Sequence, residues 1–288
     1  MNRTGLAIAL AAAVVVGVLF GVYPRFDIAI SAFFYNRHTG LFVLNAQPWV
    51  NHSRAAARWL SAIILAPACL AIIGKLFMPG RRVLIGGRAA ILLTITMALG
   101  PGVLTNLVLK DHWGRERPID VTQLGGTHRF TAWWDPRGDC PSNCSFVAGE
   151  PSGAFWTLAP AALAPPQWRL LAYSGALVFG AAIGLLRIAG GGHFFSDVAF
   201  AGVLTFLLVW AMHGILFRWR ATRTTDDAVE GVLARAGEAM YAAIRGADGR
   251  AARAKAAAAF TPAALPEQLA SLPHVPIVRA NCGDTVTP

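Results

Sequence analysis

Runs of apolar residues separated by short polar stretches fill most of the chain. The longer runs reach or approach the roughly 20 residues that a helix needs to cross the hydrocarbon core of a bilayer. They cover residues 5–23, 59–78, 89–109, 153–164, 170–186 and 198–217. Because lipid offers the backbone no hydrogen-bond partner, each run is predicted to be a helix. The pattern therefore predicts an all-α membrane protein, a bundle of six transmembrane helices.

The first and the fourth run depart from a simple transmembrane helix. The fourth is short, contains Pro160 and ends at the Pro-Pro pair 165–166, so it reaches bilayer length only if it begins near Pro151. The first follows the polar residues MNRT, as the apolar part of a signal peptide would. No clear small-x-small cleavage site stands before Pro24, so this run is expected to remain as an uncleaved span.

The segments outside the runs complete the predicted organisation. Residues 26–49 are apolar but broken by Asn, Arg and His, which indicates an interfacial helix on the outer membrane surface. After residue 217 the chain becomes rich in Ala, Arg and acidic residues, typical of a polar helix, and then forms a Pro-rich tail expected to be poorly ordered. We therefore divide the chain into a first span with its interfacial segment (1–58), a core (59–217) and a C-terminal helix and tail (218–288).

Composition supports the membrane assignment. Of the 288 residues 55% are hydrophobic and only 14% are charged, whereas soluble domains carry about a quarter of charged residues. The net charge of +10 could indicate nucleic-acid binding. The cations are scattered among apolar spans, however, which favours anionic lipid head groups and a topology signal. No nucleic-acid partner is expected.

The order of the spans places two polar loops on one side of the membrane. The loop 110–150 follows the third run and the loop around 187–197 follows the fifth, so two crossings separate them. The stretch KLFMPGRRVLIGGR (75–88) gathers four cations in one short loop, which favours a cytoplasmic position for that loop. Both polar loops are then predicted to lie on the outer face.

Two cysteines in the longer loop leave several readings open. Cys140 and Cys144, in DCPSNC, have the spacing of a small disulfide in an oxidising compartment, of a pair of free thiols, or of half a metal site. No further His or Cys stands at ligand spacing beside them. A metal is therefore not expected, and the choice between a disulfide and two thiols stays open.

Candidate chemistry begins with KDHWGRERP (110–118). Lys110 and Arg117 are two helical turns apart, so both can point the same way from the end of the third span. Pro118 then ends the helix. Taken alone, this stretch is also typical of cations that reach from a helix end into the head-group region.

The second loop, RIAGGGHFFSDV (187–198), makes a binding site the stronger interpretation. Its glycines let the backbone approach a ligand between Arg187 and His193. Asp197 follows His193 by four residues, close enough for a carboxylate to fix the imidazole tautomer. Three cations with a His–Asp pair predict a site where a nucleophile faces a doubly charged tetrahedral anion.

This arrangement resembles the type 2 phosphatidic acid phosphatase family, which includes lipid A phosphatases. The family's first and third motifs, K-x6-R-P and S-R-x5-H-x3-D, are matched in order by Lys110, Arg117, Pro118, Arg187, His193 and Asp197, with Leu186 where the family usually has Ser. The resemblance implies that His193 attacks phosphorus and becomes a phosphohistidine, with Asp197 orienting it. It also implies that the three cations and the backbone at Gly149 hold the phosphoryl oxygens, with no metal or other cofactor.

The family's middle motif, P-S-G-H, matches this chain in two alternative registers. In one, residues 147–150 (VAGE) place Glu150 where the family has the His that protonates the leaving alkoxide. In the other, the literal P-S-G at 151–153, with Ser152 and Gly153, is followed by Ala154. A carboxylic acid with a raised pKa can donate that proton and Ala cannot, so we expect Glu150 to be the general acid. A site with no working acid is the remaining reading.

The resemblance implies a membrane-embedded phosphomonoesterase on the periplasmic face of a bacterial inner membrane. Its substrate would be a phosphorylated lipid: lipid A, phosphatidylglycerol phosphate, phosphatidic acid or undecaprenyl pyrophosphate. The basic loop with Trp133 and Trp134 favours a large lipid, and hence lipid A. Two alternatives remain: a phosphotransferase that moves the phosphoryl group between lipids through His193, and a lipid-phosphate binder or transporter with a degenerate site.

Overall fold

The computed structural model describes residues 3–45, 47–80, 83 and 85–259. Within them, five helices are long and apolar enough to cross a membrane. They are α1 (Arg3–Val22), α3 (Pro48–Phe77), the continuous helix formed by α4 (Gly87–Met97), η1 (Ala98–Leu109) and α5 (Lys110–His112), α8 (Pro166–Ala189), and α9 (Phe195–His213) with η4 (Gly214–Arg218). The predicted all-α membrane fold is confirmed.

The fourth apolar run forms two short helices instead of one long one. These are α6 (Gly149–Phe155) and α7 (Leu158–Leu163). Pro160 has no N–H to donate to the carbonyl of Trp156, and that carbonyl accepts instead from the Ala159 N–H at 2.8 Å. The helix is thus interrupted at 156–157, where the Trp156 side chain is fully buried. The described residues contain five long apolar helices, with α6 and α7 as a broken sixth segment.

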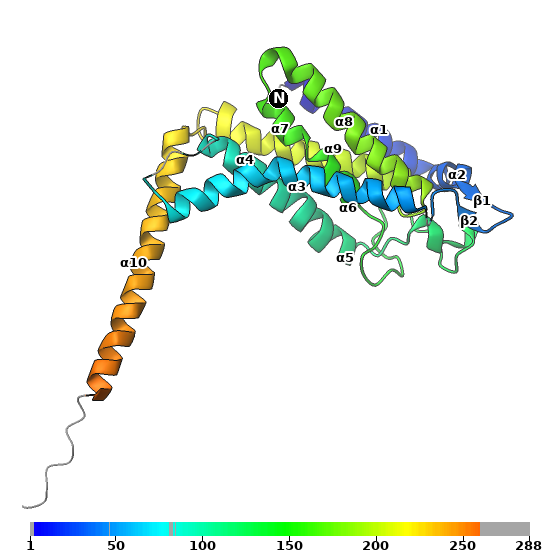
Figure 1. The fold of residues 1–288 in the computed structure, drawn as a ribbon. Coiled ribbons are helices and arrows are strands. Elements are labelled where there is room, and N and C mark those ends of the chain that lie inside the picture. Colours follow the sequence, from blue (N-terminus) through cyan, green and yellow to red (C-terminus); the bar gives the residue numbers. More distant parts are fainter. Residues whose placement is uncertain (1–2, 46, 81–82, 84, 260–288) are drawn as a thin grey trace, which may run out of the picture. The chain divides into compact units, whose positions relative to one another are not determined.

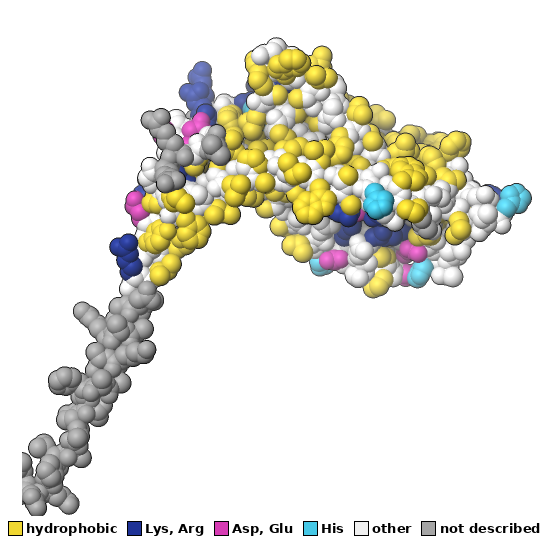
Figure 2. Space-filling view, in the orientation of Figure 1, with side chains coloured by type: hydrophobic (Ala, Val, Ile, Leu, Met, Phe, Trp, Pro, Cys, Tyr) yellow, Lys and Arg dark blue, Asp and Glu magenta, His cyan; other side chains and the backbone are white. Residues whose placement is uncertain are grey.

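The long helices pack around α6 and α9. α6 lies against α8, α9 and η1, while α9 also packs on α1 and α4, and α3 on α4 (Figure 1). Large apolar side chains such as Trp59, Leu170 and Val178 stay exposed on the outside of the helices. Figure 2 shows that hydrophobic side chains cover most of the visible bundle surface, with charged groups gathered near α5. An apolar exterior of this kind is suited to lipid.

The predicted interfacial helix is only partly correct. Residues 26–49 contain the short helix α2 (Arg25–Phe33) and then a hairpin of β1 (Tyr35–Asn36) and β2 (Leu41–Phe42). The strands are antiparallel, with Tyr35 paired to Phe42. The Asn36 side chain accepts hydrogen bonds from the backbone N–H groups of His38 and Thr39, and Gly40 takes a φ of +68°. These turn contacts reverse the chain between the two strands.

The second span is longer than the hydrophobic pattern predicts. α3 begins at Pro48, eleven residues before the apolar run, and Pro48 is a favourable first residue of a helix. The domain boundary expected at residue 58 therefore lies inside α3. The added turns carry Arg54 and Arg58, which prove important for the site.

The C-terminal segment begins as the predicted polar helix, α10 (Asp226–Ala259). Its first turns belong to the compact unit that extends to Glu238. There Asp226 accepts hydrogen bonds from Arg88, and Glu230 pairs with Lys75 at 3.2 Å. The second unit begins at Ala239, and its described part is the remainder of α10. The tail expected to be poorly ordered, 260–288, lies outside the described residues.

Candidate active site

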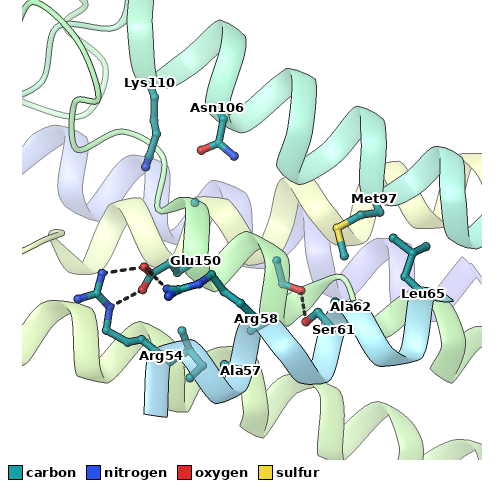
Figure 3. A pocket seen from close by; sticks show the side chains of 14 residues that line it. Arg54, Ala57, Arg58, Ser61, Ala62, Leu65, Met97, Asn106, Lys110 and Glu150 are labelled. Atoms are coloured by element: carbon teal, nitrogen blue, oxygen red, sulfur yellow. Dashed lines mark hydrogen bonds and ion pairs between the residues drawn. The ribbon is translucent and has the colours of Figure 1, made fainter. Parts of the chain in front are cut away.

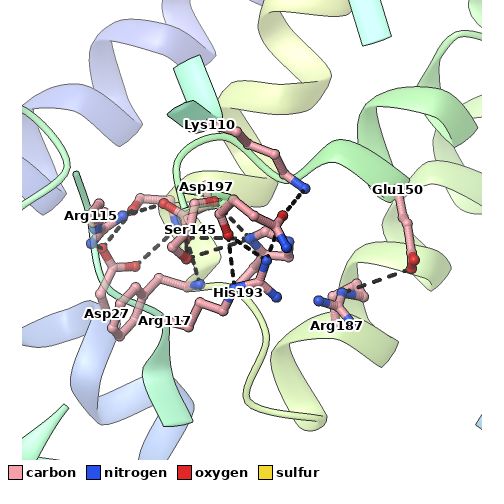
Figure 4. A network of polar contacts seen from close by, with 12 residues as sticks. Asp27, Lys110, Arg115, Arg117, Ser145, Glu150, Arg187, His193 and Asp197 are labelled. Carbon is pink, nitrogen blue, oxygen red and sulfur yellow. Dashed lines mark hydrogen bonds and ion pairs between the residues drawn. The ribbon is translucent and has the colours of Figure 1, made fainter. Parts of the chain in front are cut away.

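The two polar loops predicted to share one face meet beside α6 (Figure 4). α5 provides Lys110 and the chain after it provides Arg117. The last turn of α8 provides Arg187, and the turn between α8 and α9 provides His193. The charges of the three cations act directly on His193. The structure therefore brings together the four residues that define the expected phosphate site.

His193 is held as a neutral imidazole. Its Nδ1 lies 2.7 Å from the backbone oxygen of Ser145. A carbonyl only accepts hydrogen bonds, so Nδ1 carries the proton and Nε2 keeps its lone pair. Burial, followed by the charges of Arg187, Arg117 and Lys110, lowers the pKa of His193 well below its usual range. The ring is thus uncharged at neutral pH, with Nε2 available as a nucleophile.

Asp197 does not contact the imidazole as its spacing suggested. Its Oδ2 lies 3.9 Å from His193 Nδ1, too far for a hydrogen bond. The same oxygen accepts from Ser145 Oγ at 2.5 Å and from the Phe194 N–H at 2.8 Å, while Oδ1 pairs with Arg115. The carboxylate therefore fixes Ser145 and the turn, and the Ser145 carbonyl fixes the ring. Sequence spacing could not show that Ser145 lies between the two.

Two cations of the site converge on Asn143, a residue that sequence reasoning did not single out. Lys110 Nζ donates to Asn143 Oδ1 at 3.1 Å, and Arg117 Nη2 donates to Asn143 O at 2.6 Å and to Oδ1 at 2.9 Å. Asn143 has a φ of +51°, a conformation that Asn tolerates better than most residues. It lies in the loop closed by a Cys140–Cys144 disulfide, which answers the question left open for this pair. Asn143 Oδ1 accepts from both side chains, so the two cations converge on one acceptor atom.

The third cation has an unused donor. Arg187 Nε is buried without a hydrogen-bond partner among the described residues, and it lies 3.8 Å from Glu150 Oε2. Gly192 packs against this guanidinium so closely that a Cβ would collide with it. A Cβ at Gly149 would lie 3.2 Å from Lys110 Nζ. Both glycines bring backbone next to the cations, as expected of a loop that binds an anion.

Glu150 lies beside the site, and its carboxylate forms ion pairs with two arginines of α3. Its oxygens accept from Arg54 Nε and Nη2, both at 2.7 Å, and from Arg58 Nη1 at 3.2 Å (Figure 3). Burial by itself would raise the pKa of Glu150, but the Arg54 hydrogen bonds and the charges of Arg187, Arg54 and Arg58 hold it below its ordinary value. This corrects the expectation of a raised pKa: the group is ionised at neutral pH, whereas a general acid must carry a proton.

Arg54 and Arg58 were missed because the apolar run begins only at Trp59. The signal was present in their i, i+4 spacing, which places both on one face of a helix. To recognise this face from the sequence, the predicted helix would have had to begin at Pro48, as α3 does.

In the alternative register of the middle motif, Ser152 and Gly153 form their hydrogen bonds with neighbouring helices and not with the three cations. Ser152 is buried, with its Oγ 3.0 Å from Thr205 Oγ1 and 3.2 Å from Thr105 Oγ1. It thus joins three helices through hydroxyl groups. The Gly153 carbonyl accepts from Ser61 Oγ at 3.3 Å. Of the two registers, the one with Gly149 and Glu150 lies beside Lys110 and Arg187.

A cavity of about 390 Å³ opens beside these residues. Charged side chains, Arg54, Arg58, Lys110 and Glu150, line one end, and the apolar side chains Leu65 and Met97 line the other (Figure 3). Such a cavity suits an amphipathic ligand with an anionic head and an apolar chain. Among the described residues, no group of three or more His, Cys, Asp or Glu is arranged to hold a metal ion. A reaction without a metal or other cofactor stays a prediction.

A neutral histidine beside three cations, one of which also lines an amphipathic cavity between membrane helices, is the arrangement expected of a membrane phosphatase. The sequence matches the PAP2 superfamily over residues 89–221. The chain belongs to this superfamily, and it is a bacterial membrane lipid phosphatase. The resemblance that the first and third motifs indicated is thereby confirmed.

Three relatives support this assignment. The chain is 32% identical over 202 residues to the lipid A 4'-phosphatase of Francisella tularensis subsp. novicida (strain U112), a match over 70% of this chain and 90% of that protein. It is 37% identical over 116 residues to a lipid A 4'-phosphatase of Rhizobium leguminosarum, and 35% over 115 residues to that of Rhizobium etli. These two matches cover 40% of this chain, and 49% and 44% of the relatives. No solved structure matches the chain.

Proposed function

We propose that the protein removes a phosphate from lipid A through a phosphohistidine on His193. The observation that carries this proposal is the hydrogen bond from His193 Nδ1 to the Ser145 carbonyl, which leaves the lone pair of a neutral ring on Nε2, in a site where three cations lower the pKa of that ring. Support for the substrate comes from the relatives, each a lipid A 4'-phosphatase. The amphipathic cavity adjoining the site agrees with a large phosphorylated lipid.

In the first step, Nε2 of His193 attacks phosphorus while the bond from phosphorus to the leaving oxygen breaks. Lys110, Arg117 and Arg187 bind the phosphoryl oxygens and stabilise their charge in the transition state. The oxygens take the place of Asn143 as acceptors for Lys110 and Arg117. The backbone N–H of Gly149, at the start of α6, supplies a further donor.

Glu150 is proposed to give its proton to the leaving alkoxide. The bound phosphate brings negative charge to the same guanidinium groups that otherwise keep Glu150 ionised, so its pKa rises on binding and it takes up a proton. In the second step, Glu150 accepts a proton from water while water attacks phosphorus. The bond to Nε2 then breaks and its electron pair returns to the imidazole, which releases inorganic phosphate.

The test is phosphate release by the purified protein from a panel of lipid phosphates, with the position of loss on lipid A read by mass spectrometry. We expect His193→Ala and His193→Gln to lose turnover by many decades because no covalent intermediate forms. His38→Ala, in the exposed turn of the hairpin, is the matched control. Activity of His193→Ala within about tenfold of the unsubstituted protein would refute the mechanism. Transfer of the phosphate to an added lipid, instead of its release, would indicate the phosphotransferase.

We further propose that the site faces the periplasm from a bacterial inner membrane. Two features support this orientation: the four cations in the stretch 75–88, which includes the connection from α3 to α4, and the Cys140–Cys144 disulfide, a bond typical of oxidising compartments. In a background without Cys69 and Cys282, a cysteine at exposed Thr127 should react with a membrane-impermeant reagent added to cells with a permeabilised outer membrane. A cysteine at Arg220 should react only after the inner membrane is opened. The reverse pattern would invert the topology.

A further inference from the structure

A second set of charged side chains lies buried behind the nucleophile. Arg115 donates from Nη2 to Asp27 Oδ2 at 2.8 Å, and its Nη1 pairs with Asp197. Asp27 also accepts from the Ser196 N–H at 3.0 Å and from Ser196 Oγ at 2.6 Å. Asp27, Arg115, Ser196 and Asp197 are each at most 1% exposed. We call these four residues the buried ionic cluster (Figure 4).

All three nitrogens of the Arg115 guanidinium donate hydrogen bonds. Arg115 Nε donates to the Thr131 carbonyl at 3.0 Å, Nη1 also donates to Ser196 Oγ at 2.9 Å, and the group lies 4.5 Å from the centre of the Phe194 ring. Burying charges is costly unless each one is paired and hydrogen-bonded. Two carboxylates with one guanidinium leave one net negative charge, so the cluster favours positive charge nearby.

Hydrogen bonds connect the cluster to the nucleophile. Asp197 links the cluster to His193 along two routes: through Ser145, whose carbonyl accepts from Nδ1, and through Phe194, the residue after the nucleophile. Asp27 secures the next residue of the turn by accepting from the Ser196 N–H. The segment that carries His193 is thus fixed at residues 194, 196 and 197.

Asp27 comes from α2, far outside the stretch 89–221 that matches the superfamily. Local sequence gave no reason to select it, since it lies in a segment predicted only to rest on the membrane surface. The contact spans 169 residues from Asp27 to Ser196.

We propose that Asp27 is a positioning residue for catalysis, which acts through Arg115 and Asp197 to hold His193 Nε2 in line with phosphorus and to stabilise the positive imidazole of the phosphohistidine. The inference rests on the proposed function of His193. On this proposal α2 contributes to catalysis, although it lies outside the stretch that matches the superfamily.

The test compares Asp27→Asn with the unsubstituted protein in full-length form. Asn keeps the size and one acceptor oxygen but removes the charge. We expect kcat to fall about 10- to 100-fold, the range typical of a misplaced reacting group. The KM and the inhibition constant of inorganic phosphate should change little, because the three phosphate-binding cations are untouched. The amount of phosphohistidine trapped by an alkaline quench should fall with kcat. Asp135→Asn, which removes the partly exposed carboxylate partner of Arg137, is the matched control.

A double variant separates positioning from general stability. If Asp27 acts through Asp197, the pair Asp27→Asn/Asp197→Asn should lose little more activity than Asp197→Asn alone, whereas independent roles would multiply the two losses. Unchanged kcat in Asp27→Asn, or multiplied losses, would overturn the inference.

If Asp27→Asn does not yield folded protein, the variant Ser196→Ala tests the role of Asp27 instead. This variant removes the hydroxyl that bridges Asp27 and Arg115 but keeps every charge. A reduced kcat at constant KM supports the inference, and an unchanged kcat refutes it. His193→Ala measured in parallel keeps the two proposals distinct: activity there would refute the proposed function, whereas an inactive His193→Ala beside a fully active Asp27→Asn would refute only the role of Asp27.

Discussion

Replacing Arg54 tests how the protein controls the protonation of Glu150. Arg54 donates two hydrogen bonds of 2.7 Å to the Glu150 carboxylate, and both side chains are 24% exposed. Hydrogen bonds to charged groups contribute about 1.5–3 kcal/mol, and partial exposure favours the lower end of that range. Since 1.36 kcal/mol corresponds to a factor of ten, Arg54→Gln should raise the protonated fraction of free Glu150 at neutral pH about tenfold or more.

The sign of the pH effect follows from the role proposed for Glu150. A general acid works when protonated, and Arg54 favours the ionised form, so activity should rise as the pH falls. Arg54→Gln raises the pKa of Glu150 and should displace the kcat/KM profile toward higher pH. We use kcat/KM because it reports the free enzyme. Arg58→Gln, which removes a longer contact of 3.2 Å from a more exposed side chain, should displace the profile less.

The assay measures kcat/KM between about pH 4 and pH 9, with lipid A and with p-nitrophenyl phosphate. The p-nitrophenolate leaving group needs no proton, so its profile should respond little to Arg54→Gln. A profile for lipid A that stays in place or moves to lower pH would refute this reasoning. A parallel displacement with both substrates would show that Arg54 acts on another group.

Three further predictions concern the acid, the loop and the metal. Glu150→Gln should cost about 10²–10⁴-fold in kcat on the lipid but much less on p-nitrophenyl phosphate; a harmless Glu150→Gln with a severe Ser152→Ala would restore the alternative register. Replacing Cys140 and Cys144 by Ser should remove about 2 kcal/mol of stabilisation from the loop and lower the melting temperature, as scanning calorimetry would show; an unchanged melting temperature would contradict this. Activity should survive EDTA, and inhibition reversed by added Mg²⁺ would count against a metal-free site.

The membrane fold was largely predictable because lipid leaves the chain few choices. Apolar runs of bilayer length must form helices, whatever packs against them. Counting the predicted membrane crossings also placed the loops at 110–118 and 187–197 on one face. The fourth run was the exception, since Pro160 prevents a continuous helix and only packing decides how the two pieces lie.

Residues that act within one loop were also accessible from sequence. The spacing of Lys110 and Arg117, and of Arg187 and His193, predicted a shared site, and the structure places the three cations around His193. Asp197 was found as well, but its contact was wrong: four residues of spacing favoured the imidazole, whereas Ser145 and Arg115 bind the carboxylate.

The sequence by itself determined which segments cross the membrane and which side chains could bind phosphate, because both depend on local pattern and on the bilayer. Only the tertiary structure decided what surrounds them. Arg54 meets Glu150 across 96 residues, and Asp27 meets Arg115 across 88. The first contact lowers the pKa of Glu150, and the second connects α2 to the residues around His193. They arise from how α2 and α3 pack beside α6 and α9, and no periodicity along the chain records that packing.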